Sequence, residues 1–253
     1  MSSNFLKINE NKTNLLMIVS PTYNCDSLND VSISFGGSLI LPSSTATNLG
    51  VKIDSSMSLQ DQINSITSKG YFYMSNFYRV ADKLTFDLKV QLITTYIIPL
   101  VDYCNVVLTS ATKQYIHKLQ KLINCAVRFV FNLNQRKRFI SITPYLRKLH
   151  ILPVEFRINY KLCLLVYKCI HGLAPQYLCD LLTEKTGYSR LRSSNDLFIL
   201  HKDIPNSKYG ENAFSYAAPH QWNNLPADLR SCTSIKLFKT FLKTYYFNKC
   251  YNM

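Results

Sequence analysis

TKQYIHKLQKLINCAVRFV is the sequence of residues 112–130, and the rest of the chain is organised around it. Apolar residues recur in it at three- and four-residue steps, a spacing typical of an amphipathic helix. They are Ile116, Leu119, Leu122, Ile123, Ala126, Phe129 and Val130. At ~100° per residue, four other side chains fall on the opposite face of that helix. We call them the basic stripe: Lys113, His117, Lys121 and Arg128.

The basic stripe lies in a region without acidic residues. Between Tyr103 and Val154, 52 positions hold nine Lys and Arg and no Asp or Glu. Ordinary solvated helix faces mix both signs, because Glu and Lys four residues apart stabilise each other. A basic helix followed by Arg136, Lys137 and Arg138 suits a phosphate backbone, since neutralised phosphates release condensed counterions. The sequence predicts RNA or DNA backbone as the partner; the alternative is a solvated face that keeps the protein soluble.

Length, composition and charge favour a folded protein with an acidic partner. The 253 residues suffice for one large or two modest domains, and a hydrophobic content of 47% argues against a disordered chain. The net charge of +14 and the pI of 9.4 favour an acidic partner. No apolar run approaches the ~20 residues of a spanning helix, which disfavours a membrane. No secretory signal follows Met1, so we expect an intracellular protein of the nucleus or cytoplasm.

The eight cysteines are consistent with a reducing compartment. They are scattered along the chain and form no Cys-x-x-Cys pair. Several have apolar neighbours, where a free cysteine behaves as a small hydrophobic residue. A zinc site from Cys163, Cys169, His171 and Cys179 is conceivable, but the spacing matches no closed zinc pattern. The sequence therefore predicts no metal site.

The periodicity divides the chain into three segments. Residues 1–56 alternate in the manner of strands and turns, residues 57–182 have helical periodicity, and residues 183–253 collect Ser, Asn, Gly and Pro. We expect a mainly α fold with a small β portion. A β-hairpin remnant comes first, a helical bundle follows, and an irregular lobe with a final helix ends the chain.

Local signals place several elements within these segments. A hairpin is expected at Gly36-Gly37, and a further strand over residues 48–53. The first long helix should be interrupted near Gly70. The next helix should begin after Thr85 and end at Pro99.

The C-terminal segment holds two further candidates for nucleic-acid contact. Lys236, Lys239 and Lys243 recur at helical spacing after the capping residue Ser234, and would form a second basic stripe. Trp222 could stack on a base. A lone tryptophan in a proline-rich turn is more often a core residue under a loop, and we favour that interpretation.

Six sequence blocks occur in an order that matches one known family. They are Asn4–Ile18 (NFLKINENKTNLLMI), Asn48–Asp54 (NLGVKID), Leu100–Asn105 (LVDYCN) with the helix from Lys118 to Arg128, Leu149–Val154 (LHILPV) with Arg157-Ile158, His171–Pro175 (HGLAP) with Tyr177-Leu178, and Ala218–Pro226 (APHQWNNLP). The first resembles the late palm motif of reverse transcriptases from non-LTR retrotransposons of the jockey-like kind. The second is similar to the strand near their primer grip. The others resemble their thumb and C-terminal region.

The resemblance implies a protein without its own catalytic centre. In the family, magnesium ions are held by aspartates that include a Tyr-x-Asp-Asp hairpin, upstream of the late palm motif; this chain has no two adjacent acids. Lys12 matches the late palm lysine, which would assist pyrophosphate departure, and without metal ions it should be idle. The resemblance thus implies no cofactor in this chain, and no polymerase activity.

The thumb resemblance assigns a role to the basic residues. A polymerase thumb lays a helix against the template–primer duplex and contacts its backbone without reading bases. The candidate nucleic-acid-binding residues are Lys113, His117, Lys121, Arg128, Arg136, Lys137 and Arg138. His117 is the weakest member, because a neutral imidazole adds little Coulomb attraction.

Two alternatives to this function stay open. The chain could be a relic or a protein-interaction module with no nucleic-acid role, which an exposed apolar patch would favour. It could also be a piece of a longer, active reverse transcriptase whose catalytic aspartates lie upstream of Met1, with the missing palm and fingers as its partner.

Overall fold

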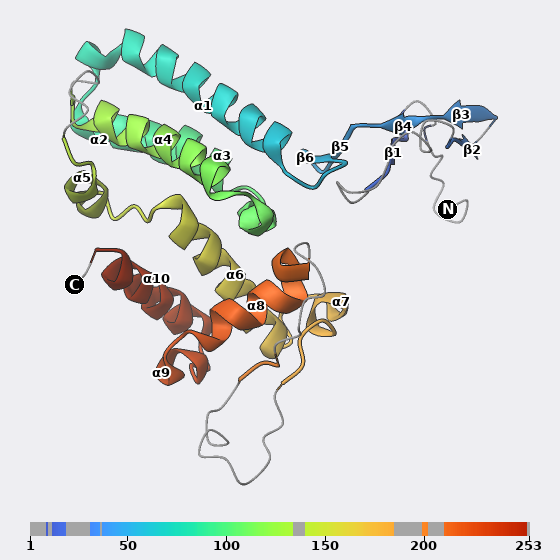
Figure 1. The fold of residues 1–253 in the computed structure, drawn as a ribbon. Helices are drawn as coiled ribbons and strands as arrows, with labels where there is room; N and C mark the ends of the chain where they lie inside the picture. The colour runs from blue at the N-terminus through green and yellow to red at the C-terminus, as the bar shows by residue number, and fades with distance from the viewer. Residues whose placement is uncertain are drawn as a thin grey trace. The chain divides into compact units, whose positions relative to one another are not determined.

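The computed structural model describes residues 9, 12–18, 31–35, 37–133, 140–184, 199–201 and 210–251. The chain divides into two compact units, Met1–Ser65 (unit 1) and Ile66–Met253 (unit 2). The sequence placed boundaries after residues 56 and 182; the second of these lies inside unit 2. Figure 1 shows strands near the N-terminus and helices elsewhere, so the chain is mainly α with a small β portion, as expected.

The described residues of unit 1 form three two-stranded sheets. Strand β1 (Leu15–Leu16) pairs in parallel with β4 (Pro42–Ser43), and β2 (Ile33–Phe35) pairs antiparallel with β3 (Ser38–Ile40). The β2–β3 pair confirms the predicted hairpin. Gly37 has a φ of +89°, the left-handed conformation that such a turn requires and that glycine adopts without steric cost.

The predicted single strand over residues 48–53 is wrong. Strands β5 (Thr45–Asn48) and β6 (Val51–Asp54) form a second hairpin, whose turn is Leu49-Gly50. Both turn residues have positive φ, 47° and 81°, as a two-residue primed turn requires. The apolar Leu49 concealed the turn in the sequence. It is 84% exposed, because it lies at the hairpin tip rather than on a packed strand.

The first helices of unit 2 include the predicted amphipathic helix, which is the last of them. They are α1 (Gln60–Arg79), which begins in unit 1, η4 (Ala81–Lys83), α2 (Phe86–Leu92), η5 (Ile93–Ile97), α3 (Ile98–Asp102), η6 (Asn105–Ser110) and α4 (Lys113–Val130). Six of the seven predicted apolar residues of α4 are buried, and Ile116 is half-buried. Thr85 caps α2 as expected, because its hydroxyl accepts a hydrogen bond from the Leu88 amide at 3.4 Å.

The helix that begins after Thr85 does not end at Pro99. It continues through the π-helical turn η5 into α3, where Pro99 occupies the first turn. Proline is tolerated there, and the wider π turn before it relieves the clash of the ring with the preceding carbonyls. The helix ends at Asp102.

The interruption predicted near Gly70 is also wrong, because α1 is continuous from Gln60 to Arg79. Gly70 instead permits a close approach of α1 to α4, which run side by side in Figure 1. A Cβ atom on Gly70 would lie 2.4 Å from Cδ2 and 2.8 Å from Cδ1 of the fully buried Leu122. The glycine is therefore a packing residue rather than a helix breaker.

We expect Gly70→Ala to lower the free energy of unfolding by about 1–3 kcal/mol, because the added methyl group overpacks the α1–α4 contact. Alanine's better helix propensity offsets about 1 kcal/mol of the packing cost. Urea denaturation measures the change, and Lys69→Ala on the exposed face of α1 is the control. A more stable Gly70→Ala variant would contradict the packing role.

The rest of unit 2 is built around α6 (Val154–Ile170). The other helices are α5 (Thr143–Lys148), α7 (Gln176–Cys179), η8 (Gly210–Asn212), α8 (Phe214–Asn223), α9 (Ala227–Arg230) and α10 (Ile235–Tyr251). Helices α8 and α10 lie against α6 (Figure 1). The predicted final helix is confirmed as α10. The expectation of an irregular lobe is corrected for residues 210–230, where the structure has η8, α8 and α9.

The core between these helices contains Trp222. Its side chain is fully buried, and its ring lies 5.8 Å from the ring of Phe238 on α10. Phe238 in turn stacks on Tyr167 of α6, with ring centroids 4.3 Å apart. The interpretation of Trp222 as a core residue is confirmed.

Candidate nucleic-acid interface

Three members of the basic stripe lie on the exposed face of α4. Lys113, His117 and Lys121 are exposed, and within the described ranges none of them makes an ion pair. The helix turns this face outward because its opposite face carries the buried residues that contact the rest of unit 2. The sequence therefore predicted the exposure of these three side chains correctly.

Arg128 has a structural role that the sequence did not reveal. It is half-buried, and its Nη2 donates a hydrogen bond to the carbonyl of Ile140 at 3.1 Å. This bond ties the end of α4 to the segment that leads into α5. Arg136, Lys137 and Arg138 lie outside the described residues, and the structure assigns them no place.

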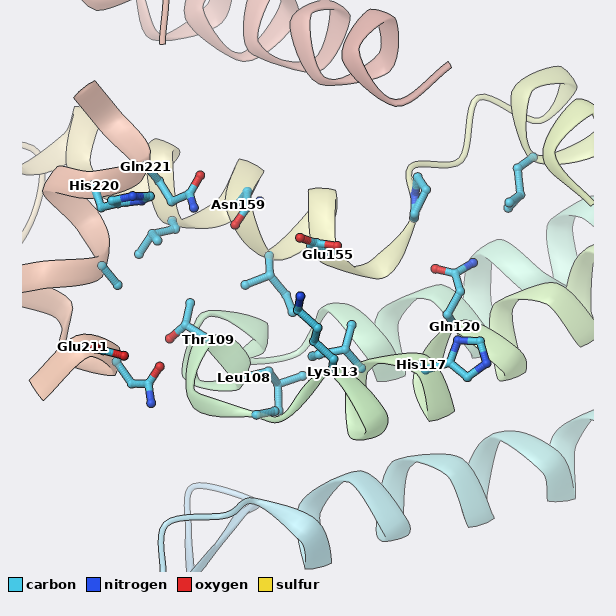
Figure 2. A pocket seen from close by; sticks show the side chains of 18 of the residues that line it. Leu108, Thr109, Lys113, His117, Gln120, Glu155, Asn159, Glu211, His220 and Gln221 are labelled. Atoms are coloured by element: carbon cyan, nitrogen blue, oxygen red, sulfur yellow. The ribbon is translucent and has the colours of Figure 1, made fainter. Parts of the chain in front are cut away.

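A groove of about 820 Å³ opens beside the first turns of α4. Its walls come from α4, α6 and α8, and Figure 2 shows Lys113 and Glu155 pointing into it from opposite sides. The polar side chains that line it include Lys113, His117, Glu155, Asn159, His220 and Gln221. Lys121 and Arg128 are not among its lining residues, so the basic stripe splits: its first two members border the groove, and Lys121 lies on the open helix face.

The groove brings acidic groups close to a region that is free of them in sequence. Glu155 is the first residue after the acid-free interval, and it lines the groove together with Glu211. An acid-free stretch of sequence therefore does not become an acid-free surface. Of the three exposed members of the basic stripe, Lys121 is the one that does not line the groove with these two carboxylates.

A half-buried side-chain amide, that of Gln120, connects two walls of the groove. The Gln120 side chain on α4 accepts a hydrogen bond from the Val154 amide at 2.9 Å and donates one to Asn124 at 2.8 Å. Val154 is the first residue of α6, so this bond holds the start of α6 against α4. It satisfies one of the backbone amides that a helix start leaves without an intrahelical partner.

Sequence reasoning missed the groove residues on α6 and α8. Asn159, His220 and Gln221 line the groove, and Tyr216 stacks near His220 with ring centroids 6.3 Å apart. A weak signal existed in the four-residue spacing of Glu155 and Asn159, which places them on one helix face. Nothing local indicated that α8 would meet this face.

Lys12 belongs to unit 1, whereas the basic stripe belongs to unit 2. It is exposed, and its backbone amide donates to the carbonyl of Asn9 at 3.1 Å in a short turn. Within the described residues, no group of three or more His, Cys, Asp and Glu side chains is arranged to hold a metal ion. Cys163, Cys169, His171 and Cys179, considered above as zinc ligands, all belong to the described residues and are not arranged as such a group.

The buried thiols are poor nucleophiles. Burial raises the pKa of Cys163 to about 12, and the Sγ atom lies 3.3 Å from the hydroxyl of Tyr246. Burial and the neighbouring Cys179 raise the pKa of Cys169 to about 11. Both thiols are protonated at neutral pH, and a thiolate is the reactive form. They behave as small core residues, as the sequence predicted.

Asp102 and Arg157 join two of the sequence blocks quoted above. The Arg157 Nε donates to Oδ1 of Asp102 at 2.7 Å, and its Nη2 donates to Oδ2. The pair connects the end of α3 to α6, and each side chain is largely shielded from solvent. A two-point ion pair of this kind fixes the orientation of the guanidinium plane.

A scan against protein-family models, a search of curated proteins and a search of solved structures returned no match. No helix in the described part of the chain combines the length and the apolar character needed to cross a bilayer. The resemblance to reverse transcriptases accordingly stands on the sequence blocks alone.

Proposed function

We propose that this chain binds the sugar–phosphate backbone of RNA or DNA without sequence specificity, through the exposed face of α4. The observation that carries the proposal is the exposure of Lys113, His117 and Lys121 on one helix face, without ion-pair partners among the described residues. The two lysines are not neutralised by acids in the described structure, so they remain available to displace the counterions of a polynucleotide.

The geometry favours backbone contacts over base recognition. Lys113, His117 and Lys121 follow one another at four-residue steps along one face of α4, so their positions rise by about 6 Å per step along the helix axis. Lysine is a point charge on a flexible stem, which suits a phosphate rather than a particular base edge. His117 adds a hydrogen-bond donor at the rim of the groove.

The sequence resemblance supports a wider form of the same proposal. In it, the chain is the non-catalytic C-terminal portion of a non-LTR retrotransposon reverse transcriptase, with α4 as the thumb helix. The magnesium-binding aspartates of the family then belong to a region before the late palm motif, and no catalytic step falls to this chain. Lys12 has no reaction to assist.

A pair of charge-matched variants tests the role of α4. We expect Lys113→Ala combined with Lys121→Ala to weaken binding of a short RNA/DNA hybrid about tenfold at low salt, because two phosphate contacts are lost. Fluorescence anisotropy measures the dissociation constant. The control combines Lys69→Ala with Lys83→Ala, which removes the same charge from exposed positions elsewhere in unit 2. Equal losses in the two double variants would show that only net charge matters.

An exposed aromatic surface supports a second candidate, a protein-interaction module. Phe72 on α1 is 63% exposed, and Tyr96 on η5 is 45% exposed. Tyr73 links them, because its ring lies 6.0 Å from Phe72 and 5.5 Å from Tyr96. Exposed apolar surface of this kind marks sites of association. If the wild-type chain fails to bind the hybrid, this candidate is the better one.

A further inference from the structure

A hollow of about 270 Å³ lies between α6 and α10, on a different side of α6 from the groove described above. Its polar lining residues are Asp102, His150, Arg157, Tyr160, Lys161 and Lys243. They come from the end of α3, the segment before α6, α6 itself and α10. The fold thus brings together cations that are far apart in the sequence.

The charges in this hollow do not balance. Its described lining residues include Arg157, Lys161 and Lys243 but a single carboxylate, Asp102, and that carboxylate is engaged in the two-point pair with Arg157. Lys161 and Lys243 are exposed, and among the described residues neither makes an ion pair. Two positive charges therefore remain uncompensated in one concavity, where the low-dielectric walls strengthen their field.

Arg157 is oriented before any ligand arrives. Asp102 occupies two of the five N–H donors of its guanidinium group, which leaves three donors on a fixed plane. A planar donor group held in place loses little conformational entropy on binding an anion. The two flexible lysines can then adjust around that fixed point.

The wall formed by the segment before α6 is also held in place. The Tyr251 hydroxyl on α10 donates to the carbonyl of Ile151 at 2.6 Å, and the ring of His150 stacks on Phe247 with centroids 5.2 Å apart. These contacts secure α10 to the start of α6, so Lys243 and Arg157 keep their separation.

A second hollow continues the positive surface. It shares His150 with the first, and Arg147 and Lys148 of α5 line it together with Ser141 and Thr143. None of the described residues that line it is acidic. Arg147 and Lys148 are exposed. The cations therefore extend on both sides of His150, which gives an anion an attractive approach to the smaller hollow.

We propose that the hollow between α6 and α10 is a phosphate-binding site, in which Arg157, Lys161 and Lys243 ligate the phosphate oxygens. Guanidinium and ammonium groups at one concavity form charge-assisted hydrogen bonds with a compact, multiply charged oxyanion. The phosphate group belongs to a nucleic acid or to a free nucleotide. None of the three proposed phosphate ligands lies on α4. The proposal of a phosphate-binding site is therefore independent of whether α4 binds a duplex.

The test begins with inorganic phosphate titrated into the full chain by calorimetry at constant ionic strength. We expect a dissociation constant on the order of 1 mM. Lys161→Ala and Lys243→Ala should each weaken binding about tenfold, since each removes one charge-assisted hydrogen bond. Both lysines are exposed, so the variants keep their melting temperature. Lys236→Ala and Lys239→Ala are the controls, because these exposed lysines of α10 do not line the hollow.

Two single-stranded RNA oligonucleotides, identical except for a 5′-phosphate or a 5′-hydroxyl, identify the source of the phosphate group. Displacement of phosphate only by the 5′-phosphorylated strand indicates a terminal phosphate, and displacement by both strands indicates internal diesters. Displacement by neither, with phosphate still bound, indicates a small-molecule ligand. The proposal is overturned if inorganic phosphate does not bind, or if the Lys236 and Lys239 variants lose as much affinity as the Lys161 and Lys243 variants. The Lys113 and Lys121 double variant should bind inorganic phosphate normally, which separates this site from α4.

Discussion

Trp222→Ala is expected to lower the free energy of unfolding by about 3–5 kcal/mol, the range for removing a large aromatic side chain from a packed core. Trp222 is fully buried, and it packs with Phe238, which stacks in turn on Tyr167. The loss of the indole would leave a cavity at the junction of α6, α8 and α10, where the packing of the three helices against each other stabilises them. Urea denaturation monitored by far-UV circular dichroism measures the change.

Substitutions of Trp222 also distinguish a role in the core from a role in base stacking. Tyr177→Ala is the stability control, because that aromatic side chain is 69% exposed and its removal should change stability by less than about 0.5 kcal/mol. Trp222→Phe should keep the affinity for nucleic acid, since a fully buried ring has no face to offer a base. A specific loss of single-strand affinity in Trp222→Phe, with the fold intact, would contradict the core assignment.

Asp54→Ala is expected to reduce the local stability of unit 1 by about 2–4 kcal/mol, because several hydrogen bonds to a charged carboxylate are lost together. Backbone amides of Ser58 and Leu59 donate to Asp54 at 2.9 and 2.7 Å, and Ser56 donates to it as well. These bonds hold Leu59 in a left-handed conformation, with a φ of 57°, immediately before α1. Without the carboxylate, that strain is no longer compensated.

The contribution of Asp54 should also depend on pH in a defined direction. Burial alone would raise its pKa, but hydrogen bonds from Ser56, Ser58 and Leu59 outweigh burial and hold the pKa below its ordinary value of 3.8. The folded state therefore binds this proton less tightly than the unfolded state does. The stabilisation is complete above the ordinary value and is lost as the pH falls through the lower value of the folded protein.

Hydrogen exchange of the first turn of α1 measures this effect. The difference in protection between the wild type and Asp54→Ala should be constant near neutral pH, and it should shrink as the pH falls below 3.8. The control is Asp61→Asn, an exposed carboxylate in the same turn. If the difference in protection grew at low pH, its sign would be wrong, and the hydrogen bonds to the Asp54 carboxylate could not be the source of the stabilisation.

The elements that the sequence predicted well are those specified by local periodicity. The buried face of α4 follows from one apolar pattern, and the Thr85 cap follows from one side chain and the amide three residues later. The errors share a different origin. Gly70 lies inside a helix, where it makes room for Leu122, which is 52 positions away in the sequence. No local signal indicates that contact. Leu49 was assigned to a strand because hydrophobicity concealed a turn residue.

The candidate interface was predictable only in part, because contacts between residues that are distant in the sequence leave no local signal. Helical spacing placed Lys113, His117 and Lys121 on an exposed face. It could not show that Arg128 is bonded to Ile140, or that Glu155 and His220 would line a groove beside Lys113. The cationic hollow at Arg157, Lys161 and Lys243 was hidden for the same reason, because its members lie on different elements.

The salt dependence of binding to a short RNA/DNA hybrid tests the central claim most directly. If α4 contacts the backbone, the logarithm of the association constant falls linearly with the logarithm of the salt concentration. The slope for the Lys113 and Lys121 double alanine variant should then be shallower than that of the wild type by about two. The same slope in both proteins, or no binding by the wild type near physiological salt, would contradict the account and leave the stripe as a solvated helix face.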